Sequence, residues 1–379
     1  MKQSTLKLTA LAMLLSGVMS ANAQTADPIN VVTTAVPFLR ISPDARAGGM
    51  GDAGIATAPD ANASFWNLGK TVFAKNTSSV ALTYTPWLKD LGLNDVYLAT
   101  MGGYYKLDDQ QAISLGLRYF SLGSIQFTDA SGTPLNSGRP REFSIDLGYS
   151  RKLSAKSGVG IALRYISSDL ANGASSGGTT YKKGSSVAGD LHYFHNGAKA
   201  NGAGFNWGVT LSNLGAKISY TNDANQKDYI PANFGLGGAY TKVFDQDNKL
   251  TFALDINKLL VPTPADISDS AGLADYRSKG VVGSWFSSFG DAPGGFSEEL
   301  KELSYSLGAE YTYKDQFSFR AGYFYENPTK GNRKYFSVGA GLNYNVFGLN
   351  FAYLLPSGSG TNRNPLSNTL RFSLVFNVK

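Results

Sequence analysis

The stretch ELSYSLGAEYTYK, residues 302–314, alternates apolar and polar side chains along its length. Successive side chains of a β-strand point to opposite faces, so the stretch predicts a strand with one apolar and one polar face. The apolar face carries no charge and consists of Leu303, Tyr305, Leu307, Ala309, Tyr311 and Tyr313. The polar face consists of Ser304, Ser306, Gly308, Glu310, Thr312 and Lys314.

The same alternation recurs at residues 143–149, 159–165, 250–256 and 336–346. A soluble β-sandwich also alternates, so this pattern alone does not decide the fold class. The strands here run about ten or more residues, the length that a tilted strand needs to cross a bilayer, whereas sandwich strands average about five or six. Aromatic residues gather toward the strand ends, as in an interfacial girdle. They include Tyr84, Tyr104, Tyr119, Tyr149, Tyr165, Tyr240, Tyr311, Tyr313 and Tyr353.

The connections between the strands support a transmembrane barrel. The patterns predict about fourteen antiparallel strands, joined alternately by short and long links. Short turns at one end and long loops at the other are typical of outer-membrane barrels, whose long loops are extracellular. The predicted strands lie near residues 78–87, 96–107, 111–128, 142–154, 157–170, 185–196, 205–215, 231–244, 248–261, 302–314, 316–327, 334–347, 348–357 and 369–379.

The N-terminus has the features of a secretory signal peptide. Lys2 and Lys7 precede an apolar run over residues 8–19. The sequence Ala21-Asn22-Ala23 then has the small residues of a signal-peptide cleavage site. The chain has no cysteine, which excludes disulfides, thiolate metal sites and a lipoprotein anchor. The predicted division is therefore a signal peptide (1–23), an N-terminal hatch or plug (24–77) and an outer-membrane barrel (78–379) of a Gram-negative bacterium.

The hatch prediction rests on the stretch RAGGMGDAGIATAPDANASFWNLGK, residues 46–70. It has neither a helical stripe nor strand alternation, and its glycines and alanines allow close backbone packing. A barrel of about fourteen strands is too wide for its own side chains to fill, so a plug entering from the periplasmic side is expected. Its charged residues Asp44, Arg46, Asp52 and Asp60 are expected to meet inward charges of the barrel. The candidates for those inward charges are Arg118, Arg164, Arg320 and Arg371. Inward carboxylates of the barrel are also expected to pair with the inward arginines, namely Asp146, Asp190, Asp255 and Glu310.

A resemblance to a known family becomes specific in this region. The run DANASFWNLGK, residues 60–70, resembles the D-A-S-x-x-x-x-N-P-A element of FadL-type fatty-acid transporters, with Asp60, Trp66 and Asn67 matching and Leu68-Gly69 replacing Pro-Ala. The longer run over residues 36–67 is more similar to the PorV/PorQ family of that superfamily, whose PorV members belong to the type IX secretion system. The similarity covers essentially the whole mature chain.

This resemblance implies a function and a set of partners. Proteins of this kind bind the C-terminal signal domains of exported cargo at the large type IX translocon barrel. They then carry the cargo to a surface sortase complex with a PorU-like component. The remaining partner is outer-membrane lipid; no cofactor or metal is expected. The formal charge of +6 is spread over loops and does not indicate nucleic-acid binding.

The longest loop offers a candidate contact surface. The run GVVGSWFSSFGDAPGGF, residues 280–296, places six large apolar side chains in a segment expected to meet water. Exposed aromatic clusters mark contact sites for partners, but the loop could equally fold over the barrel mouth as a lid and bury its own side chains. The six residues are Val281, Val282, Trp285, Phe286, Phe289 and Phe296.

Two other functions are alternatives to this one. A FadL-type transporter of hydrophobic small molecules, such as long-chain fatty acids, would share the fold; a continuous apolar tunnel would favour it, and a filled lumen would favour the protein shuttle. An enzyme is disfavoured, because the G-x-S-x-G match around Ser175 lies in a Gly/Ser loop. His192 and His195 are three residues apart on a predicted strand and point to opposite faces. Residues 245–249, DQDNK, are predicted to form a tight turn and not a calcium loop.

Overall fold

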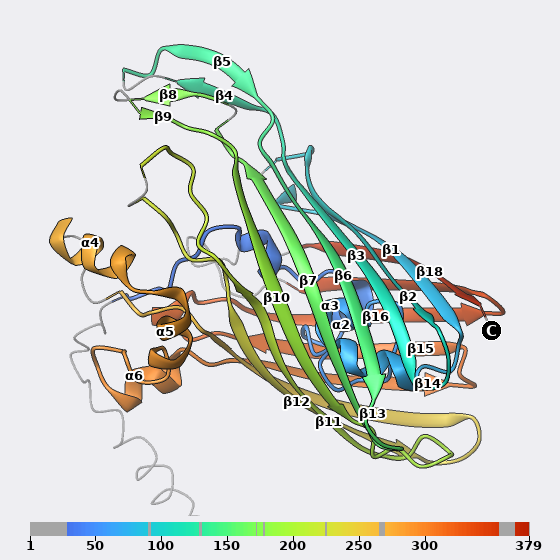
Figure 1. Cartoon of the computed structure of the whole chain (residues 1–379). Helices are drawn as coiled ribbons and strands as arrows, with labels where there is room; N and C mark the ends of the chain where they lie inside the picture. Colours follow the sequence, from blue (N-terminus) through green and yellow to red (C-terminus); the bar gives the residue numbers. More distant parts are fainter. Residues whose placement is uncertain are drawn as a thin grey trace, which may run out of the picture.

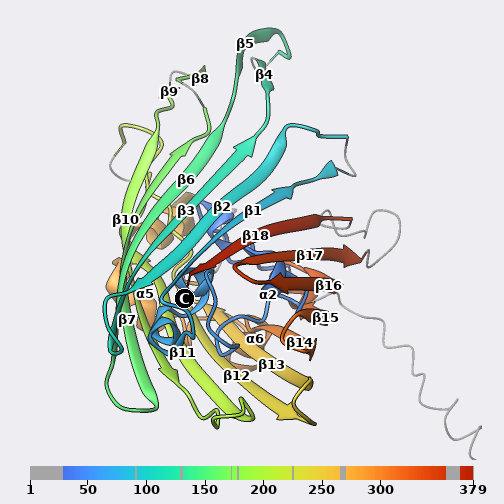
Figure 2. The ribbon, with the colours of Figure 1, turned by 90° about the vertical axis from the view of Figure 1, so that its right-hand side faces the viewer.

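A computed structural model describes residues 29–89, 92–128, 131–171, 173–176, 179–223, 226–264, 270–355 and 368–378. Within these ranges, fourteen strands pair in antiparallel fashion and close into one barrel (Figures 1 and 2). The order around the barrel is β1-β18-β17-β16-β15-β14-β13-β12-β11-β10-β7-β6-β3-β2. The barrel class and strand number predicted from the alternation are thus confirmed. The predicted signal peptide lies outside the described residues.

The strand boundaries agree with the predicted ranges to within a few residues, with one exception. The predicted strand 111–128 ends at Leu122, because Gly123 adopts φ 80 and turns the chain away from the barrel. Residues beyond it form the separate hairpin of β4 (Ile125–Thr128) and β5 (Pro134–Gly138). The barrel strands are β1 (Ser78–Pro86), β2 (Val96–Lys106), β3 (Gln111–Leu122), β6 (Arg141–Lys152), β7 (Ser157–Asp169), β10 (Gly184–His195), β11 (Gly204–Gly215), β12 (Asn233–Val243), β13 (Asn248–Leu259), β14 (Ser304–Tyr313), β15 (Phe317–Tyr325), β16 (Lys334–Tyr344), β17 (Phe347–Leu355) and β18 (Leu370–Val378).

The polarity of the barrel is the reverse of that of a soluble protein. Large apolar side chains face outward, with Leu163 69% and Leu147 63% exposed, whereas Arg371 and Asp146 face inward and are 1% and 2% exposed. This distribution suits an outer face in hydrocarbon and a polar interior. Tyr104, predicted to belong to the aromatic girdle, is instead buried inside the barrel. Its neighbour Tyr105 occupies the outward position, since adjacent strand residues cannot share a face.

The two ends of the barrel differ, and we refer to them as the loop end and the turn end. The loop end carries β4 and β5, the small hairpin of β8 (Ser175–Ser176) and β9 (Thr179–Thr180), and three helices (Figure 1). The helices are α4 (Ser270–Ser278), α5 (Val281–Ser287) and α6 (Phe296–Lys301), followed by the short η4 (Pro328–Lys330). The strand alternation gave no sign of these helices. No helix among the described residues is long and apolar enough to span a bilayer.

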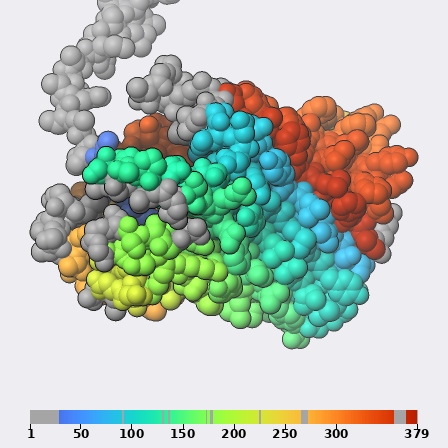
Figure 3. Space-filling view, turned by 90° about the horizontal axis from the view of Figure 1, so that it is seen from above, coloured from blue at the N-terminus to red at the C-terminus, as the bar shows by residue number. Residues whose placement is uncertain are grey.

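The first and last strands close the cylinder. β1 pairs with β18 from Ser78 opposite Val378 to Tyr84 opposite Phe372. The space-filling view shows the blue-cyan start of the barrel lying directly against its red end (Figure 3). The described part of the barrel therefore has no free sheet edge between its first and last strands.

Residues 29–77, which we call the luminal segment, run through the interior of the barrel (Figure 2). The segment contains η1 (Pro37–Arg40), α2 (Ala45–Gly48), α3 (Ala63–Trp66) and η2 (Leu68–Phe73). Its described start is at the loop end, where the Asn30 amide donates to the Thr329 carbonyl at 3.1 Å. It leaves at the turn end, where the Phe73 ring lies 5.8 Å from that of Phe194. The expectation of a plug entering from the turn end was therefore wrong: the segment passes along the whole lumen from the loop end.

Candidate functional site

Hydrogen bonds between its own residues fold the luminal segment into a compact unit. Asp44 begins α2, and its Oδ1 accepts from the Ala47 amide at 2.9 Å. Its Oδ2 accepts from the Trp66 indole Nε1 at 2.6 Å, which links α2 to α3. The buried Lys70 Nζ donates to the Gly54 carbonyl at 2.6 Å. These contacts explain why a segment with little regular secondary structure has a defined shape.

Arg46 lies at the centre of a buried ion-pair group. Its guanidinium donates to both oxygens of Glu310 on β14, through Nε at 3.1 Å and Nη2 at 2.9 Å. It also donates to Asp60 Oδ2 within the segment at 2.8 Å. Arg320 on β15 donates to the same Glu310 through Nε at 2.6 Å. Two parallel hydrogen bonds between one guanidinium and one carboxylate, as between Arg46 and Glu310, form a strong type of ion pair. This ion-pair group therefore attaches the segment firmly to the barrel wall.

Asp52 forms a second attachment to the wall. It accepts from Arg371 Nη1 of β18 at 2.8 Å and from the Tyr335 hydroxyl of β16 at 2.5 Å. Its backbone has φ 64, a left-handed conformation that aspartate tolerates better than most residues. Of the four charged residues expected to meet barrel charges, Arg46 and Asp52 therefore do so. Asp44 and Asp60 instead form their hydrogen bonds within the segment, with Trp66 and Arg46.

Asn67 attaches the segment near the turn end. Its side-chain amide donates to the Tyr193 carbonyl of β10 at 2.8 Å, and its Oδ1 accepts from the Gly69 amide at the start of η2. The next residue, Leu68, donates its backbone amide to Nδ1 of His192 at 2.8 Å. A side chain at Gly69 would lie 2.9 Å from the Gly158 carbonyl of β7, so the Leu68-Gly69 pair suits this close approach.

In the middle of the lumen, backbone lies directly against backbone. A Cβ atom on Gly51 would lie 2.6 Å from the Tyr323 amide nitrogen, and Gly51 itself has φ 66. On the wall, a Cβ on Gly308 would lie 2.6 Å from the Met50 carbonyl oxygen, and one on Gly322 would lie 2.0 Å from the Gly51 nitrogen. Glycines on both partners remove the side-chain layer that normally separates packed elements.

Arg118 and Arg164 do not pair with charges of the segment, and Asp255 does not pair with an arginine. Arg118 donates to the Leu39 carbonyl at 2.7 Å, and its guanidinium lies 4.8 Å from the Phe65 ring centroid. Arg164 pairs with the barrel residues Asp146 and Asp190 on the two neighbouring strands. Asp255, expected to pair with an arginine, accepts instead from the Gly54 and Ile55 amides at 2.7 and 2.8 Å. At these positions the segment presents backbone groups and not charged side chains.

At the loop end, α5 separates the six predicted contact residues into two groups. Val282 and Phe286 lie on α5 and are 60% and 75% exposed. Phe289, just beyond the end of α5, is 52% exposed, and Phe296 at the start of α6 is 76% exposed. We call these four residues the mouth surface. Val281 and Trp285 are only partly exposed. The loop therefore has features of both alternatives: some of its apolar residues form an exposed surface, and others are turned toward the barrel as in a lid.

The inner side of the loop packs on the barrel mouth. Val281 packs against a buried cluster of Val32, Tyr229 and Val261. The Tyr229 hydroxyl lies 3.2 Å from Ser284 Oγ of α5. Burial lowers the pKa of Lys217, whose Nζ lies 4.0 Å from the centroid of the Tyr229 ring. The mouth surface is therefore held outward by a packed inner layer.

A buried ion-pair group that the sequence did not indicate holds α6. Lys258 of β13 donates to Glu299 and Glu302 at 2.9 and 2.6 Å, and Lys330 of η4 donates to Glu302 at 3.0 Å. These partners are 28 to 44 positions apart in the chain, so no local motif reveals them. The group connects the mouth loop to two barrel segments.

The weak catalytic and metal motifs have structural roles. Ser175 lies in the β8–β9 hairpin, with its Oγ 3.1 Å from the Thr180 hydroxyl. His192 faces the lumen, whereas His195 faces outward and stacks on Trp207. Asp245 accepts from the Asp247 amide at 2.9 Å in a tight turn. In the described ranges, no group of three or more His, Asp or Glu residues is placed to hold a metal ion.

A model of the family described as "Type IX secretion system protein PorV" matches residues 23–266, well over half of the chain. The chain belongs to the PorV family. The match includes the luminal segment and the strands that contact η2. The description names a secretion-system protein and no catalytic activity. No curated protein sequence matches the chain.

Solved structures show the same fold for other outer-membrane proteins. The toluene transporter TbuX of Ralstonia pickettii has a TM-score of 0.51 at 10% identity, over 89% of this chain and 98% of that chain. The toluene transporter TodX of Pseudomonas putida has a TM-score of 0.50 at 11% identity, over 92% of this chain and 98% of that chain. At such identities the likeness concerns architecture alone. This PorV-family chain is thus an outer-membrane β-barrel with an N-terminal segment before its first strand.

Proposed function

We propose that this protein is a cargo shuttle of the type IX secretion system. In this proposal it binds the C-terminal signal domain of exported cargo at the large translocon barrel and delivers the cargo to the PorU-like sortase complex. The loop end faces the cell exterior, and the luminal segment acts as a hatch that keeps the barrel closed. Membership of the PorV family supports a role in this secretion system. The position of the luminal segment inside the barrel supports a lumen that is closed to passage.

The observation that carries this proposal is the filled lumen. The luminal segment passes from one mouth to the other and is attached by Arg46, Asp52 and Asn67 to four of the surrounding strands. A cavity at the loop-end mouth, lined in part by Arg40, Glu302 and Glu326, measures about 30 Å³, room for one or two water molecules. An interior of this kind suits recognition at the surface better than passage through the barrel.

The mouth surface is the proposed contact site for cargo or translocon. Exposed phenylalanines at the centre of a small apolar area are typical anchors of protein interfaces. Phe286 and Phe296 are the most exposed of the four residues. Their positions on helices with a buried inner side give the surface a fixed shape before any partner binds, which lowers the entropic cost of binding.

Uptake of hydrophobic small molecules is the alternative. It would be favoured by an apolar tunnel through the lumen, but the interior is crossed by the buried charges of Glu310 and Arg371 and by their partly buried partners Arg46 and Asp52. Transport would require the segment to move away from these partners. The likeness to TbuX and TodX supports the fold and not this activity.

The test is capture of partners by the tagged protein from detergent-solubilised outer membranes. We expect a very large barrel protein and secreted proteins with a common C-terminal domain. Phe286→Asp together with Phe296→Asp should reduce the captured cargo at least tenfold. The control Ser287→Asp places the same charge at an exposed position of the same helix. Capture of neither class, together with loss of fatty-acid uptake on deletion, would instead support the transporter.

A further inference from the structure

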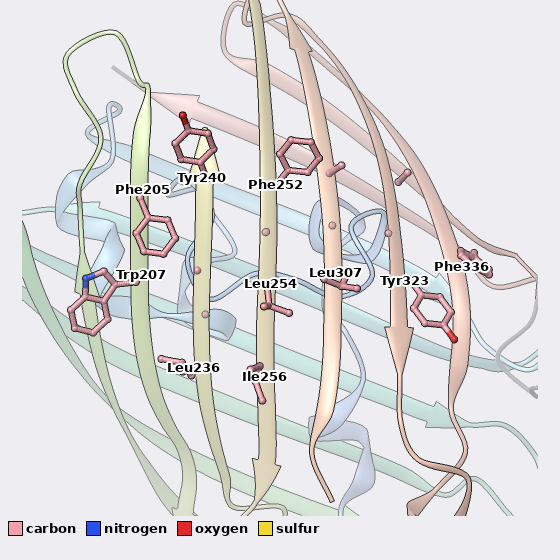
Figure 4. A pocket seen from close by; sticks show the side chains of 17 residues that line it. Phe205, Trp207, Leu236, Tyr240, Phe252, Leu254, Ile256, Leu307, Tyr323 and Phe336 are labelled. Carbon is pink, nitrogen blue, oxygen red and sulfur yellow. The ribbon is translucent and has the colours of Figure 1, made fainter. Parts of the chain in front are cut away.

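The outer wall of the barrel contains an apolar groove of about 850 Å³ across β11 to β16. Figure 4 shows aromatic side chains around it, among them Phe205, Tyr240, Phe252 and Phe336. These four residues are between 51% and 56% exposed, so they face away from the lumen. The base of the groove consists of the small outward residues Gly238, Ala309 and Ala321.

The luminal segment closes the groove from the inside. The inward residues of the same wall region are also small, and the segment lies against them: a Cβ on Gly237 would be 2.6 Å from Ile55, and one on Gly308 would be 2.6 Å from Met50. At the base of the groove, the wall therefore carries small residues on both its outer and its inner face. Its inner face is covered by the segment, whereas its outer face is open. The groove is a site on the wall and not a passage into the lumen.

Its position and size suit one acyl chain. The groove extends across six strands, about 24 Å at 4.8 Å per strand, and from Leu236 to Tyr240, about 13 Å along β12. A bilayer core is about 30 Å thick, so a chain of one leaflet spans about 15 Å. An unfilled groove would lose the dispersion contacts of its lining, which hydrocarbon restores.

The charges at the two ends of the groove indicate where a headgroup would lie. Toward the turn end, Lys242 follows Tyr240 by two residues on the same outward face of β12, with its Nζ 4.9 Å from the Phe244 ring centroid. It forms no ion pair with a residue in the described ranges. Toward the loop end, the charge of Lys258 is already neutralised by Glu299 and Glu302. Lys242 thus offers a positive charge at the turn-end side of the groove, without an ion-pair partner among the described residues.

We propose that this groove binds a phospholipid of the turn-end leaflet, with one acyl chain on Gly238, Ala309 and Ala321 and the phosphate at Lys242. An ammonium at the aromatic belt of the membrane interface is a suitable partner for a lipid phosphate. The groove lies on the outer wall of the barrel and not at the mouth surface. Lipid binding there therefore does not depend on the proposed transfer of cargo.

The test is native mass spectrometry of the full-length protein purified in mild detergent, followed by reconstitution into phosphatidylglycerol vesicles with brominated acyl chains. We expect one retained phospholipid per barrel and strong bromine quenching of Trp207, measured as the difference from Trp207→Phe. Ala309→Phe with Ala321→Phe should reduce retention at least tenfold, because both side chains would occupy the groove. Lys242→Gln should reduce it about fivefold.

Ala340→Phe is the matched control, since Ala340 is also an exposed alanine on the outer face of β16 but does not line the groove. It should retain lipid like the unmodified protein. Heat-modifiable migration on gels checks that every variant forms a barrel. Equal retention by the groove-filling and control variants, no retained lipid in the unmodified protein, or a protein partner in place of the lipid would each overturn the proposal.

Discussion

Asp52 and Arg371 lie 319 positions apart in the chain, yet their side chains meet at 2.8 Å inside the barrel. Arg371 is 1% exposed and belongs to the last strand, whereas Asp52 belongs to the segment that precedes the first strand. The contact forms only when the luminal segment lies against the last strand of the barrel. It therefore reports on the complete fold.

Replacement of Arg371 by Met should loosen the luminal segment. The change leaves Asp52 as a buried charge without its partner, which costs about 3 to 5 kcal/mol in comparable cases. In planar bilayers we expect ion conductance to rise well above that of the unmodified protein. Lys249→Met removes a partly exposed pair with Asp315 at a turn and should leave conductance unchanged. A closed Arg371→Met barrel would contradict this role.

The Arg46–Glu310 pair should show strong coupling in a double-mutant cycle. Glu310→Gln leaves Arg46 and Arg320 close together without a shared carboxylate. Because either single change already removes the pair, the double variant should lose less stability than the sum of the two single losses. We expect a coupling free energy of about 1 to 3 kcal/mol between Arg46→Met and Glu310→Gln. Urea unfolding from lipid vesicles measures it. Additive effects would show that the pair contributes little.

Gly51 should tolerate alanine much less well than Gly132 does. Both glycines have positive φ, 66 and 81. The left-handed backbone conformation should therefore destabilise the fold by a similar amount, about 1 to 2 kcal/mol, when alanine replaces either of them. Only at Gly51 would the new Cβ meet barrel backbone; at Gly132 nothing lies within 4 Å. Gly51→Ala should therefore lower the thermal midpoint clearly more than Gly132→Ala. Equal midpoints would mean that the segment can shift without cost.

Single-cysteine labelling can test the path of the luminal segment, because the chain has no native cysteine. Ile29 is 80% exposed at the loop end, and Gly132 lies in a loop at the same end. With a membrane-impermeant maleimide on intact cells, Ile29→Cys and Gly132→Cys should both react. Asp109→Cys, in an exposed turn at the other end, should react only after lysis. Labelling of Asp109→Cys alone in intact cells would reverse the proposed orientation.

Much of the barrel could be predicted from sequence because its determinants are local. Alternation with period two fixes which side chains face outward, and strands such as β14 and β16 match their predicted ranges closely. The helices α4 to α6 were missed, because their side chains are arranged by packing on Tyr229 and by the distant Lys258. The prediction that Tyr104 faces the membrane was wrong, because Tyr104 and Tyr105 are adjacent and the sequence did not show which of the two faces outward.

The site was predictable only in outline. Charged residues in a luminal segment must find partners, so contacts of Arg46 and Asp52 with the barrel were expected. Their partners depend on the position of each residue along the barrel axis, and the sequence alone does not reveal that position. Arg164 could therefore be expected to meet either the segment or the inward carboxylates, and it pairs with Asp146 and Asp190 on the adjacent strands. The roles of Gly308 and Gly322 were hidden as well, since glycine is frequent throughout the chain.

The route of the luminal segment has a consequence for biogenesis. Residues 29 to 35 lie on the far side of the membrane from Ser78, where the first strand begins. Assembly must therefore bring the leading end of the polypeptide through the full length of the ring, either while the seam between β1 and β18 is still open or by threading after it has closed.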